Sequence, residues 1–458
     1  MIDILSLPNW SVVNVERGDT CVIHAQFTIR PEYCVKCGST SIVKHGTTTS
    51  SFIDIPYCAH STVVKAHLSR FRCYDCNAVF VQPHTGMDEN MRFTNRCIKY
   101  IQRQCLRDTF TRIADDLGCD EKTVRNITSA FVDDLNAKYK PVLTRIIGMD
   151  ETTIDGKLRF IITDLVDRKP IDMLLDREKP TVSTYLWKHR NDPIEVIAMD
   201  MWRGYKSVVY QVFPNAIIVV DKFHVVRMAN EAVDKIRLKL SKDRVKAIGQ
   251  DWKRRKSLLR MRYKNLSEHG KYNLDMWLEN EPDIAIAHNL KELFYLIYEM
   301  PTREDAESLL DEWLDMIPAD MRKGKSDFKP LVTIFKEWRK EIMNYFDHRV
   351  TNAYTEALNG VAKVANRQGR GYGFEILRAK VLFSKYHVPE VPYFNVDPNI
   401  TAEEFKRLED SFVRCLSCFE LHKHRNDDVV CKFCLTRIDP DDEFLTMAED
   451  YGYTTYSE

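Results

Sequence analysis

Between residues 145 and 222 the apolar and polar positions predict a sheet followed by alternating helices and strands. RIIGMDETTI, LRFIITDLVD and KPIDMLLDR predict three successive strands that pair as an antiparallel meander. TVSTYLWKHR and YKSVVYQVF are helical by period, and each leads into a short apolar strand, EVIAMD or AIIVVD. Because strands that alternate with helices usually pair in parallel, we expect an α/β fold with a mixed sheet flanked by helices.

This element order is that of a ribonuclease-H-like core, in which the first and fourth strands lie side by side. Asp150 and Asp200 end those two strands, so their carboxylates would meet at one edge of the sheet. An acid at a strand end is also a common loop cap, and it is the pairing that favours chemistry. Carboxylates suit Mg²⁺ or Mn²⁺, and two such ions roughly 3.5 to 4 Å apart activate a nucleophile and stabilise the leaving oxygen at a phosphodiester.

The candidate for a third acid is Glu356, in TNAYTEALNGVAKVANRQGRGYGF. This segment begins with the cap-like Thr351 and Asn352 and is helical through Val364. An exposed helical glutamate more often forms a surface ion pair, and only the two aspartates favour a catalytic role here. Basic residues that follow predict contacts to a DNA backbone near Glu356; they are Lys363, Arg367 and Arg370.

Residues 93–139 predict a helix-turn-helix in front of the sheet. FTNRCIKYIQRQCL is one helix, and at least two more follow around a turn at Gly118. Apolar positions on both sides of the turn, such as Leu117 and Val124, would pack the two helices together. The exposed face of the second helix would enter a major groove with Lys122, Arg125 and Asn126. A helical hairpin with a solvated polar face is the alternative.

Eight of the thirteen cysteines form four Cys-x-x-Cys pairs, which indicate metal rather than disulfides. Two pairs near the start are joined by strand-like FIDIPY and TVVKAHLSRFRC and predict a zinc ribbon with little core of its own, one that depends on Zn²⁺ for folding. Two pairs near the end predict a second zinc ribbon. The predicted ligands are Cys34, Cys37, Cys73 and Cys76, and Cys415, Cys418, Cys431 and Cys434. A closed four-thiolate shell leaves no catalytic water, so both zinc sites would be structural.

The overall charge does not identify a nucleic-acid partner, because Lys plus Arg and Asp plus Glu both number 67. Local charge does: residues 225–264 are rich in Lys and Arg, including Lys253, Arg254 and Arg255, and favour DNA contact. Residues 226–345 predict an all-helical insertion. Trp252 within it would pack in the helical core rather than stack on an unpaired base.

No apolar run is long enough for a bilayer span, and we expect a cytoplasmic, nucleoid-associated protein without a membrane partner.

MDETTI, AMDMWRGY, VVDKFHVVRMAN and TNAYTEALNG together resemble the DDE transposases of bacterial insertion sequences, specifically the ISL-three group. Most of the chain takes part, since that group also has an N-terminal zinc ribbon and a helix-turn-helix before its catalytic domain. The resemblance implies an enzyme that recognises the terminal inverted repeats of its element, hydrolyses a phosphodiester there, and directs the freed 3′ hydroxyl at target DNA. It also implies a homo-oligomer on DNA. The C-terminal four-cysteine module is a departure from the group.

The second acid of the implied triad has two candidates, because Asp200 and Asp221 both end apolar strands. We favour Asp200, which falls on the fourth strand, since Asp221 and His224 resemble the Asp-x-x-His signature that follows the second acid in related transposases. The alternative triad is Asp150, Asp221 and Glu356. His224 would orient a carboxylate or a flanking strand, or be a buried histidine at the sheet edge.

Six segments follow from these patterns: a zinc ribbon at 1–88, a helix-turn-helix at 89–140, a core divided into 141–225 and 346–395, the insertion at 226–345, and the C-terminal zinc module at 396–458.

Two other functions remain open. A ribonuclease-H-like nuclease such as a junction resolvase needs the same acids and metals, and a DNA-binding regulator would have lost catalysis. The zinc modules and helix-turn-helix favour sequence-directed docking over the nuclease, and the presence of three acids favours an enzyme over the regulator.

Overall fold

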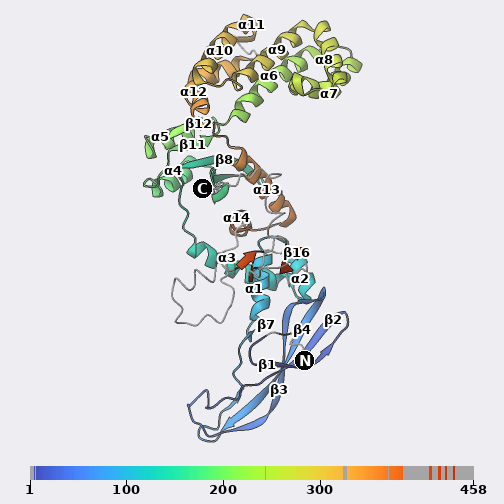
Figure 1. The fold of residues 1–458 in the computed structure, drawn as a ribbon, viewed down its shortest axis with the longest axis vertical. Helices are drawn as coiled ribbons and strands as arrows, with labels where there is room; N and C mark the ends of the chain where they lie inside the picture. The colour runs from blue at the N-terminus through green and yellow to red at the C-terminus, as the bar shows by residue number, and fades with distance from the viewer. Residues whose placement is uncertain are drawn as a thin grey trace. The chain divides into compact units, whose positions relative to one another are not determined.

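The computed structural model describes residues 5, 7–242, 244–322, 327–369 and 371–384, together with four short strands between 412 and 438. The chain divides into two compact units, Met1–Lys385 and Tyr386–Glu458. Figure 1 shows the order of the elements. In the second unit, β13 (Phe412–Arg414) pairs with β14 (Leu421–Lys423), and β15 (Val429–Val430) pairs with β16 (Arg437–Ile438). The second predicted four-cysteine site lies outside the described residues.

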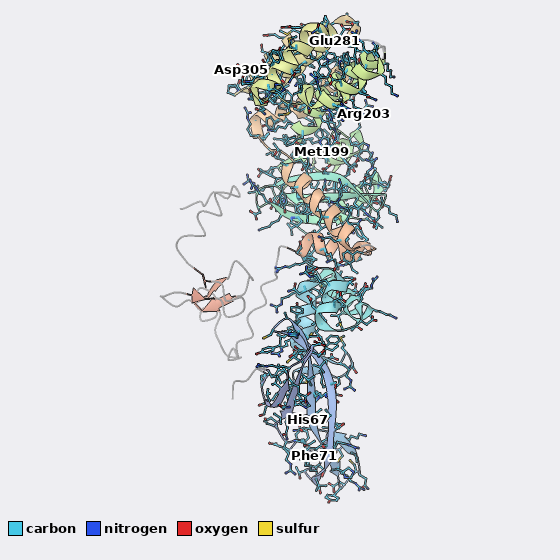
Figure 2. All side chains as sticks on the ribbon, turned by 90° about the vertical axis from the view of Figure 1, so that its right-hand side faces the viewer. His67, Phe71, Met199, Arg203, Glu281 and Asp305 are labelled. Carbon is cyan, nitrogen blue, oxygen red and sulfur yellow. The ribbon has the colours of Figure 1, made fainter. Side chains whose placement is uncertain are left out.

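A seven-stranded sheet forms the N-terminal part of the first unit. Its strands are β1 (Trp10–Glu16), β2 (Thr20–Phe27), β3 (Ile42–Tyr57), β4 (His60–Cys73), β5 (Val79–Val81), β6 (Met87–Asp88) and β7 (Phe93–Thr94). The long antiparallel hairpin of β3 and β4 contains the two predicted strand segments, and His67 and Phe71 mark β4 in Figure 2. The strand β2 pairs with β4 in parallel.

The expectation that this region has little core of its own is wrong. The strands β1 and β2 extend the hairpin, and alternate residues of β2, β3 and β4 face a common side, as the two-residue period of a strand requires. Ile23, Phe52 and Val64 are each at most 1% exposed within this cluster. The sheet therefore has apolar packing of its own, beyond the cysteine pairs at the end of the hairpin.

The predicted helix-turn-helix follows as α1 (Asn95–Gln104), α2 (Phe110–Leu117) and α3 (Glu121–Lys138). Gly118 ends α2 in the left-handed region with φ 67°, the conformation that favours glycine at this turn. A Cβ atom there would also lie 3.1 Å from the Cβ of Ser61, because α2 packs closely on the hairpin. The apolar residues on both sides of the turn are buried, as predicted.

The central five-stranded sheet has the order β10-β9-β8-β11-β12. Its elements are β8 (Ile146–Ile154), β9 (Lys157–Asp164), β10 (Lys169–Leu174), α4 (Lys179–Lys188), β11 (Val196–Met199), α5 (Arg203–Val212) and β12 (Ile217–Val220). The first three strands form the predicted antiparallel meander, and β11 pairs in parallel with both β8 and β12. The prediction of a mixed sheet with helices between its later strands is confirmed.

A helical region separates this sheet from the helices that complete it. Its helices are α6 (Lys222–Lys242), α7 (Lys246–Arg260), a short 3-10 turn (Tyr263–Asn265), α8 (Glu268–Asn280), α9 (Pro282–Ile297), α10 (Arg303–Met316), α11 (Ala319–Arg322) and α12 (Lys329–His348). After it come α13 (Ala353–Gly369) and α14 (Phe374–Phe383). All described residues between β12 and α13 are therefore helical or in connections between helices, as expected for the insertion.

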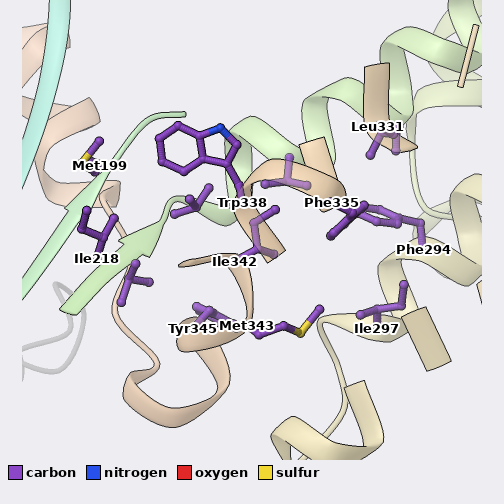
Figure 3. Close-up of a cluster of buried hydrophobic side chains, with 14 of the residues drawn as sticks. Met199, Ile218, Phe294, Ile297, Leu331, Phe335, Trp338, Ile342, Met343 and Tyr345 are labelled. Atoms are coloured by element: carbon purple, nitrogen blue, oxygen red, sulfur yellow. The ribbon is translucent and has the colours of Figure 1, made fainter. Parts of the chain in front are cut away.

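The insertion shares one hydrophobic core with the sheet. Figure 3 shows α12 carrying this core from Ile218 on β12, past Trp338 and Ile342, to Phe294 on α9. Asn344 on α12 also donates a 2.8 Å hydrogen bond to the carbonyl oxygen of Ile218. The insertion therefore continues the central domain and is not a separate globule attached by a linker.

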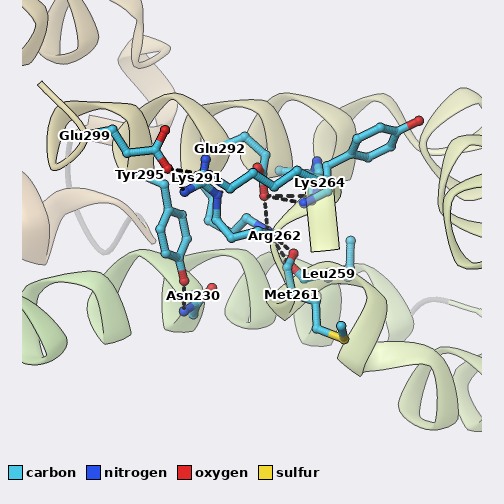
Figure 4. Close-up of polar contacts among 11 residues, drawn as sticks. Asn230, Leu259, Met261, Arg262, Lys264, Lys291, Glu292, Tyr295 and Glu299 are labelled. Carbon is cyan, nitrogen blue, oxygen red and sulfur yellow. Dashed lines mark hydrogen bonds and ion pairs between the residues drawn. The ribbon is translucent and has the colours of Figure 1, made fainter. Parts of the chain in front are cut away.

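Inside the insertion, a fully buried lysine connects two helices (Figure 4). The Nζ of Lys291 on α9 donates to the carbonyl oxygens of Leu259 and Met261, both at 2.8 Å, at the end of α7. Lys291 Nζ also forms an ion pair with Glu292 Oε1 at 2.7 Å. Trp252, on α7, is 6% exposed, and its ring centroid is 5.5 Å from that of Trp277. The structure thus confirms that Trp252 packs in the helical core, because α7 turns its apolar face toward α8.

Candidate active site and metal centres

Four thiols gather at one end of the β3–β4 hairpin. Cys34 Sγ is 3.7 Å from Cys76 Sγ, and Cys37 Sγ is 3.6 Å from Cys73 Sγ. The Sγ atoms of all four residues lie within 4.8 Å of one another. These separations are far too long for a disulfide and match the edge of about 3.8 Å of a tetrahedron whose metal–sulfur bonds are about 2.3 Å. The arrangement therefore fits a single metal ion.

Two matching turns shape this centre. Gly38 follows the first cysteine pair with φ 75°, and Asn77 follows the second pair with φ 56°. The backbone N–H groups of Cys76 and Asp75 lower the pKa of the Cys73 thiol to about 7, which favours the thiolate that binds metal. The chemistry of the donor set and the turn geometry both fit zinc.

A second cluster lies at the carboxyl ends of the central strands. Asp150 is on β8, Asp200 directly follows β11, and Asp221 directly follows β12. The parallel pairing of Met149 with Met199 and of Met199 with Val220 brings these three positions to one edge of the sheet. Asp150 and Asp221 are buried, at 7% and 0% exposed, whereas the Asp200 side chain is 34% exposed.

His224, in the first turn of α6, lies between two of these acids. Its Nε2 is 3.5 Å from Asp200 Oδ2, and its Nδ1 is 3.6 Å from Asp221 Oδ2. Burial alone would lower the pKa of His224, but Asp221, Asp200 and Asp150 together raise it. An imidazole beside these carboxylates therefore carries positive charge more readily than a free histidine does.

Glu356 completes the cluster from α13. One ligand atom each from Glu356, Asp221 and His224 lie within 4.8 Å of one another, in a group able to hold a metal ion. Glu356 is exposed at the first turn of its helix, and burial and Asp221 raise its pKa. Burial, with Asp200 and Glu356 as neighbours, raises the pKa of Asp150 to about 6. Both triads considered from the sequence therefore occupy one site.

The close approach of α13 to β8 depends on Gly148. A Cβ atom at this residue would lie within 2.7 Å of side-chain oxygens of Thr355, Asn352 and Thr163. Thr355 and Thr163 share a 2.7 Å hydrogen bond, and Asn352 donates to the carbonyl oxygen of Met149 at 3.1 Å. The residue two positions before Asp150 therefore allows the Glu356 helix to reach the sheet.

Asn359 is the site residue whose contact the sequence reasoning missed. Its Nδ2 donates to Asp150 Oδ2 at 2.7 Å, and the other oxygen of Asp150 accepts from the backbone N–H of Glu151 at 2.8 Å. The sequence does contain a pattern that indicates this contact: the polar residues Asn352, Thr355 and Asn359 are spaced so that they share one face of a helix. A polar stripe on an otherwise buried helix face indicates a bonded neighbour.

The chemistry of this donor set fits divalent cations. Four carboxylates and one imidazole converge, and Asp221 Oδ2 is buried without a hydrogen-bond partner among the described residues. Hard cations such as Mg²⁺ and Mn²⁺ prefer carboxylate oxygens, and a cation offsets repulsion between neighbouring acids. A buried carboxylate oxygen that accepts no hydrogen bond is costly, so the site is suited to a positively charged ligand.

The predicted DNA-contacting residues lie on three exposed helix faces. Lys122, Arg125 and Asn126 are exposed on α3, where Arg125 pairs with Glu121 at 2.6 Å. Lys363 and Arg367 are exposed on α13, on the face that carries Glu356, and Arg370 lies outside the described residues.

The predicted basic run falls on α6, α7 and the connections that follow each of them. Within the described part of the chain, several exposed cations there have neither an ion pair nor a side-chain hydrogen bond: Lys235, Lys239, Lys242, Lys246, Lys253, Arg254 and Lys256. Arg255, by contrast, pairs with Asp251 at 3.0 Å. Among the described helices, none is long and apolar enough to cross a bilayer.

Comparison with known proteins agrees with these features. A family model described as a transposase matches residues 147–381, and another, described as the helix-turn-helix domain of transposase family ISL3, matches residues 82–132. The transposase of insertion sequence element IS1001 from Bordetella parapertussis is 23% identical over 393 residues, which cover 80% of this chain and 93% of that protein. Because the first model spans more than half of the chain and the second covers the helix-turn-helix before it, this chain belongs to the ISL3 family of DDE transposases.

Proposed function

We propose that this transposase binds the terminal inverted repeats of its insertion sequence, hydrolyses a phosphodiester there and transfers the freed strand to target DNA. The observation that carries the proposal is the convergence of Asp150, Asp200, Asp221 and Glu356 around His224 at one sheet edge. The five-strand order, with β8 beside β11, supports a ribonuclease-H-like core for this chemistry.

In this proposal, Asp150, Asp200 and Glu356 hold the divalent cations. When bound, two Mg²⁺ or Mn²⁺ ions supply charge stabilisation at the attacking and leaving oxygens. Asp200 and Glu356 are accessible enough to meet DNA, while the buried Asp150 is held by Asn359 and its own backbone. His224 holds a proton between Asp200 and Asp221, which orients both carboxylates.

The alternative triad, with Asp221 as the second acid, has one observation in its favour. Asp221, not Asp200, groups with His224 and Glu356 as a potential metal-binding set. We retain Asp200 because it ends the strand paired with β8 and is more exposed to a substrate, whereas Asp221 is fully buried one strand farther on.

DNA docking is assigned to three surfaces in the proposal. The exposed face of α3 would read the repeat in a major groove with Lys122, Arg125 and Asn126. Lys363 and Arg367 would contact the backbone beside Glu356, and the unpaired cations of α6 and α7 would follow the flanking duplex. Zinc at the cysteine centre would fix the hairpin that packs against α2, and a homo-oligomer would bring two element ends together.

A cleavage assay on a labelled duplex carrying the flanking inverted repeat tests the proposal. With Mg²⁺ or Mn²⁺ the wild type should cut the repeat end and join it to a plasmid. Asp150→Asn, Asp200→Asn and Glu356→Gln should each lose at least about 100-fold in rate, as removal of a metal-binding acid predicts. Asp167→Asn, which alters an exposed acid between β9 and β10, is the control and should cut normally.

The alternative triad and the DNA-binding regulator each predict a distinct result in this assay. Loss of cleavage in Asp221→Asn with retention in Asp200→Asn would establish the other triad. Sequence-specific binding without cutting in the wild type and in every variant, with either metal, would exclude the transposase mechanism and leave a DNA-binding regulator.

A further inference from the structure

Helix α14 packs against both the catalytic sheet and the helix-turn-helix. Leu377 and Val381 are buried in a cluster with Ile161 of β9, Met173 of β10 and Leu358 of α13. On another side, the buried residues Ala379, Leu382 and Phe383 of α14 pack against Val132 of α3. A helix that is buried against two neighbours at once transmits the position of one to the other.

A buried lysine fastens α14 to the end of α1 and to the connection between α1 and α2. Lys380 is 5% exposed, and its Nζ donates to the carbonyl oxygens of Cys105 at 2.5 Å and Asp108 at 2.8 Å. Burial lowers the pKa of Lys380 to about 8. Because a buried ammonium needs its acceptors, this contact tolerates little displacement of α1 relative to α14.

Arg378 joins three elements through one guanidinium. Its Nε and Nη2 atoms are both 2.7 Å from Asp172 Oδ1 on β10, and its Nη1 donates to Asn136 Oδ1 on α3 at 2.6 Å. Asn136 in turn donates to Glu375 at 2.9 Å. Tyr139, at the end of α3, donates its hydroxyl hydrogen to the carbonyl oxygen of Ile171 at 2.7 Å. Planar, charge-assisted bonds of this kind fix orientation as well as distance.

The N-terminal sheet is fastened to the same body. Asp54 of β3 is fully buried and accepts hydrogen bonds from Thr94 at 2.6 Å and from Nε of Arg96 at 2.8 Å, at the start of α1. The DNA-reading elements are therefore held to the catalytic sheet by packed and charged contacts. A Gly- or Ser-rich tether would instead allow a wide range of separations.

We propose that α14 sets the cleavage position by holding the recognition helix α3 at a fixed distance from the acids Asp150 and Glu356. The same chain segment carries both constraints, since α13 bears Glu356 and leads directly into α14. The enzyme then cuts at one set number of base pairs from the sequence read by α3. This inference rests on the proposed function and adds Arg378, Asn136 and Lys380 as positioning residues.

The test maps cut positions at nucleotide resolution. Duplexes carry the inverted repeat with 1, 2 or 5 base pairs inserted between the α3 footprint and the normal cut, and the footprint is identified by its loss in Lys122→Ala. Wild-type enzyme should keep the cut at a constant distance from the footprint, so that the cut moves by the inserted length relative to the element end. Joining of the correct end should then fall at least about tenfold, since one helical turn of B-DNA spans only about 10 base pairs.

Two variants test the contacts of α14. Asn136→Ala removes the partner of Arg378 on α3 and leaves the Arg378–Asp172 pair intact, so we expect this variant to fold. Arg378→Gln removes the contact with Asn136 and the ion pair with Asp172. Each should spread the cuts over several neighbouring positions while the affinity for the repeat changes less than about threefold. Arg145→Gln is the matched control, because it breaks an exposed pair with Glu195 far from α14 in sequence, and its cuts should stay at one position.

The outcomes separate this inference from the proposed function. The role of α14 would be overturned if the wild-type enzyme cut every spaced substrate at the same element end. It would also be overturned if the Asn136→Ala and Arg378→Gln enzymes both cut at the single wild-type position. Either result would leave the proposed function standing. Absence of any cleavage by the wild type would instead remove the proposed function beneath it.

Discussion

Asn359 holds Asp150 through a 2.7 Å hydrogen bond, and its own Oδ1 is buried without a partner among the described residues. The contact crosses from α13 to β8, so it sets the carboxylate of one element from another. Positioning of this kind commonly affects the affinity for metal more than the affinity for substrate, because the oriented group is the ligand.

We expect Asn359→Ala to slow cleavage by about 10- to 100-fold, because a hydrogen bond to a charged group contributes roughly 1.5 to 3 kcal/mol. The Mn²⁺ concentration needed for half-maximal rate should rise, while affinity for the repeat stays unchanged. Asn366→Ala is the matched control on the same helix, since Asn366 donates to Asp155 at 2.8 Å away from the acids. Equal kinetics for the two variants would contradict the positioning role.

A buried histidine in the insertion makes its stability depend on pH. His288 on α9 is 2% exposed, and burial, with Lys291 nearby, lowers its pKa from the ordinary 6.5 to about 4. Between pH 6.5 and 4 the unfolded chain binds a proton that the folded chain does not. The contribution of His288 to stability is therefore complete above pH 6.5 and is lost as the pH falls toward 4.

Amide hydrogen exchange in α9 measures this loss. Wild-type protection should fall between pH 7 and pH 4 by at most about 3 kcal/mol, because the pKa of His288 is about 4 in the folded chain and 6.5 in the unfolded chain. His288→Phe should flatten the pH dependence because it removes the titrating group. His269→Phe changes an exposed histidine on α8 and should keep the wild-type slope. A slope that is the same in all three proteins would rule out His288 as the cause.

At the scale of elements, the site depends on how closely α13 approaches β8. Strand residues on both sides of Gly148 are buried, and the helix places Thr355 and Asn352 where a Cβ atom would otherwise be. A helix cannot be this near a strand unless the strand residue beneath it lacks a side chain. The Glu356 carboxylate reaches the aspartates as a consequence.

Gly148→Ala should therefore displace α13 and destabilise the core by roughly 1 to 3 kcal/mol, the usual range for overpacking. Cleavage should fall much further than stability, because Glu356 moves with its helix. Gly360→Ala on α13 is the control, since a Cβ there meets no atom within 4 Å. Thermal unfolding and cleavage rates are the two measurements, and wild-type cleavage by a folded Gly148→Ala protein would exclude this account.

At the scale of the whole molecule, charge is distributed unevenly although it sums to zero. Many surface arginines are neutralised by acids, among them Arg255 by Asp251. The exposed cations of α6 and α7 that have no acidic partner among the described residues, such as Lys253 and Arg254, lie on the same two helices, and α6 has His224 in its first turn beside the acids. These cations make the surface of α6 and α7 positive, and in the proposed function the DNA duplex next to the cut would lie along this surface.

Salt dependence of binding to the repeat tests this surface. The double variant Lys253→Gln and Arg254→Gln should reduce the slope of log affinity against log salt by about 2, since each lost phosphate contact removes about 0.9. Binding should weaken for all sequences alike. Arg255→Gln, the adjacent change at a neutralised arginine, should alter the slope by clearly less than one contact. Similar slopes for wild type and double variant would show that this face does not contact DNA.

The local sequence pattern determined most of the secondary structure of this protein and the position of its cysteine centre. Period-2 and period-3.6 apolar positions predicted the central strands and the helix-turn-helix, and the Cys-x-x-Cys spacing predicted the thiol centre, because each depends on neighbours in the chain. The sequence also identified the acids at the strand ends. Only the tertiary structure decided how they meet: His224 between Asp200 and Asp221, Asn359 on Asp150, and α14 between the sheet and α3. These contacts join residues far apart in sequence, so no local period encodes them, and packing alone selects which side chains touch.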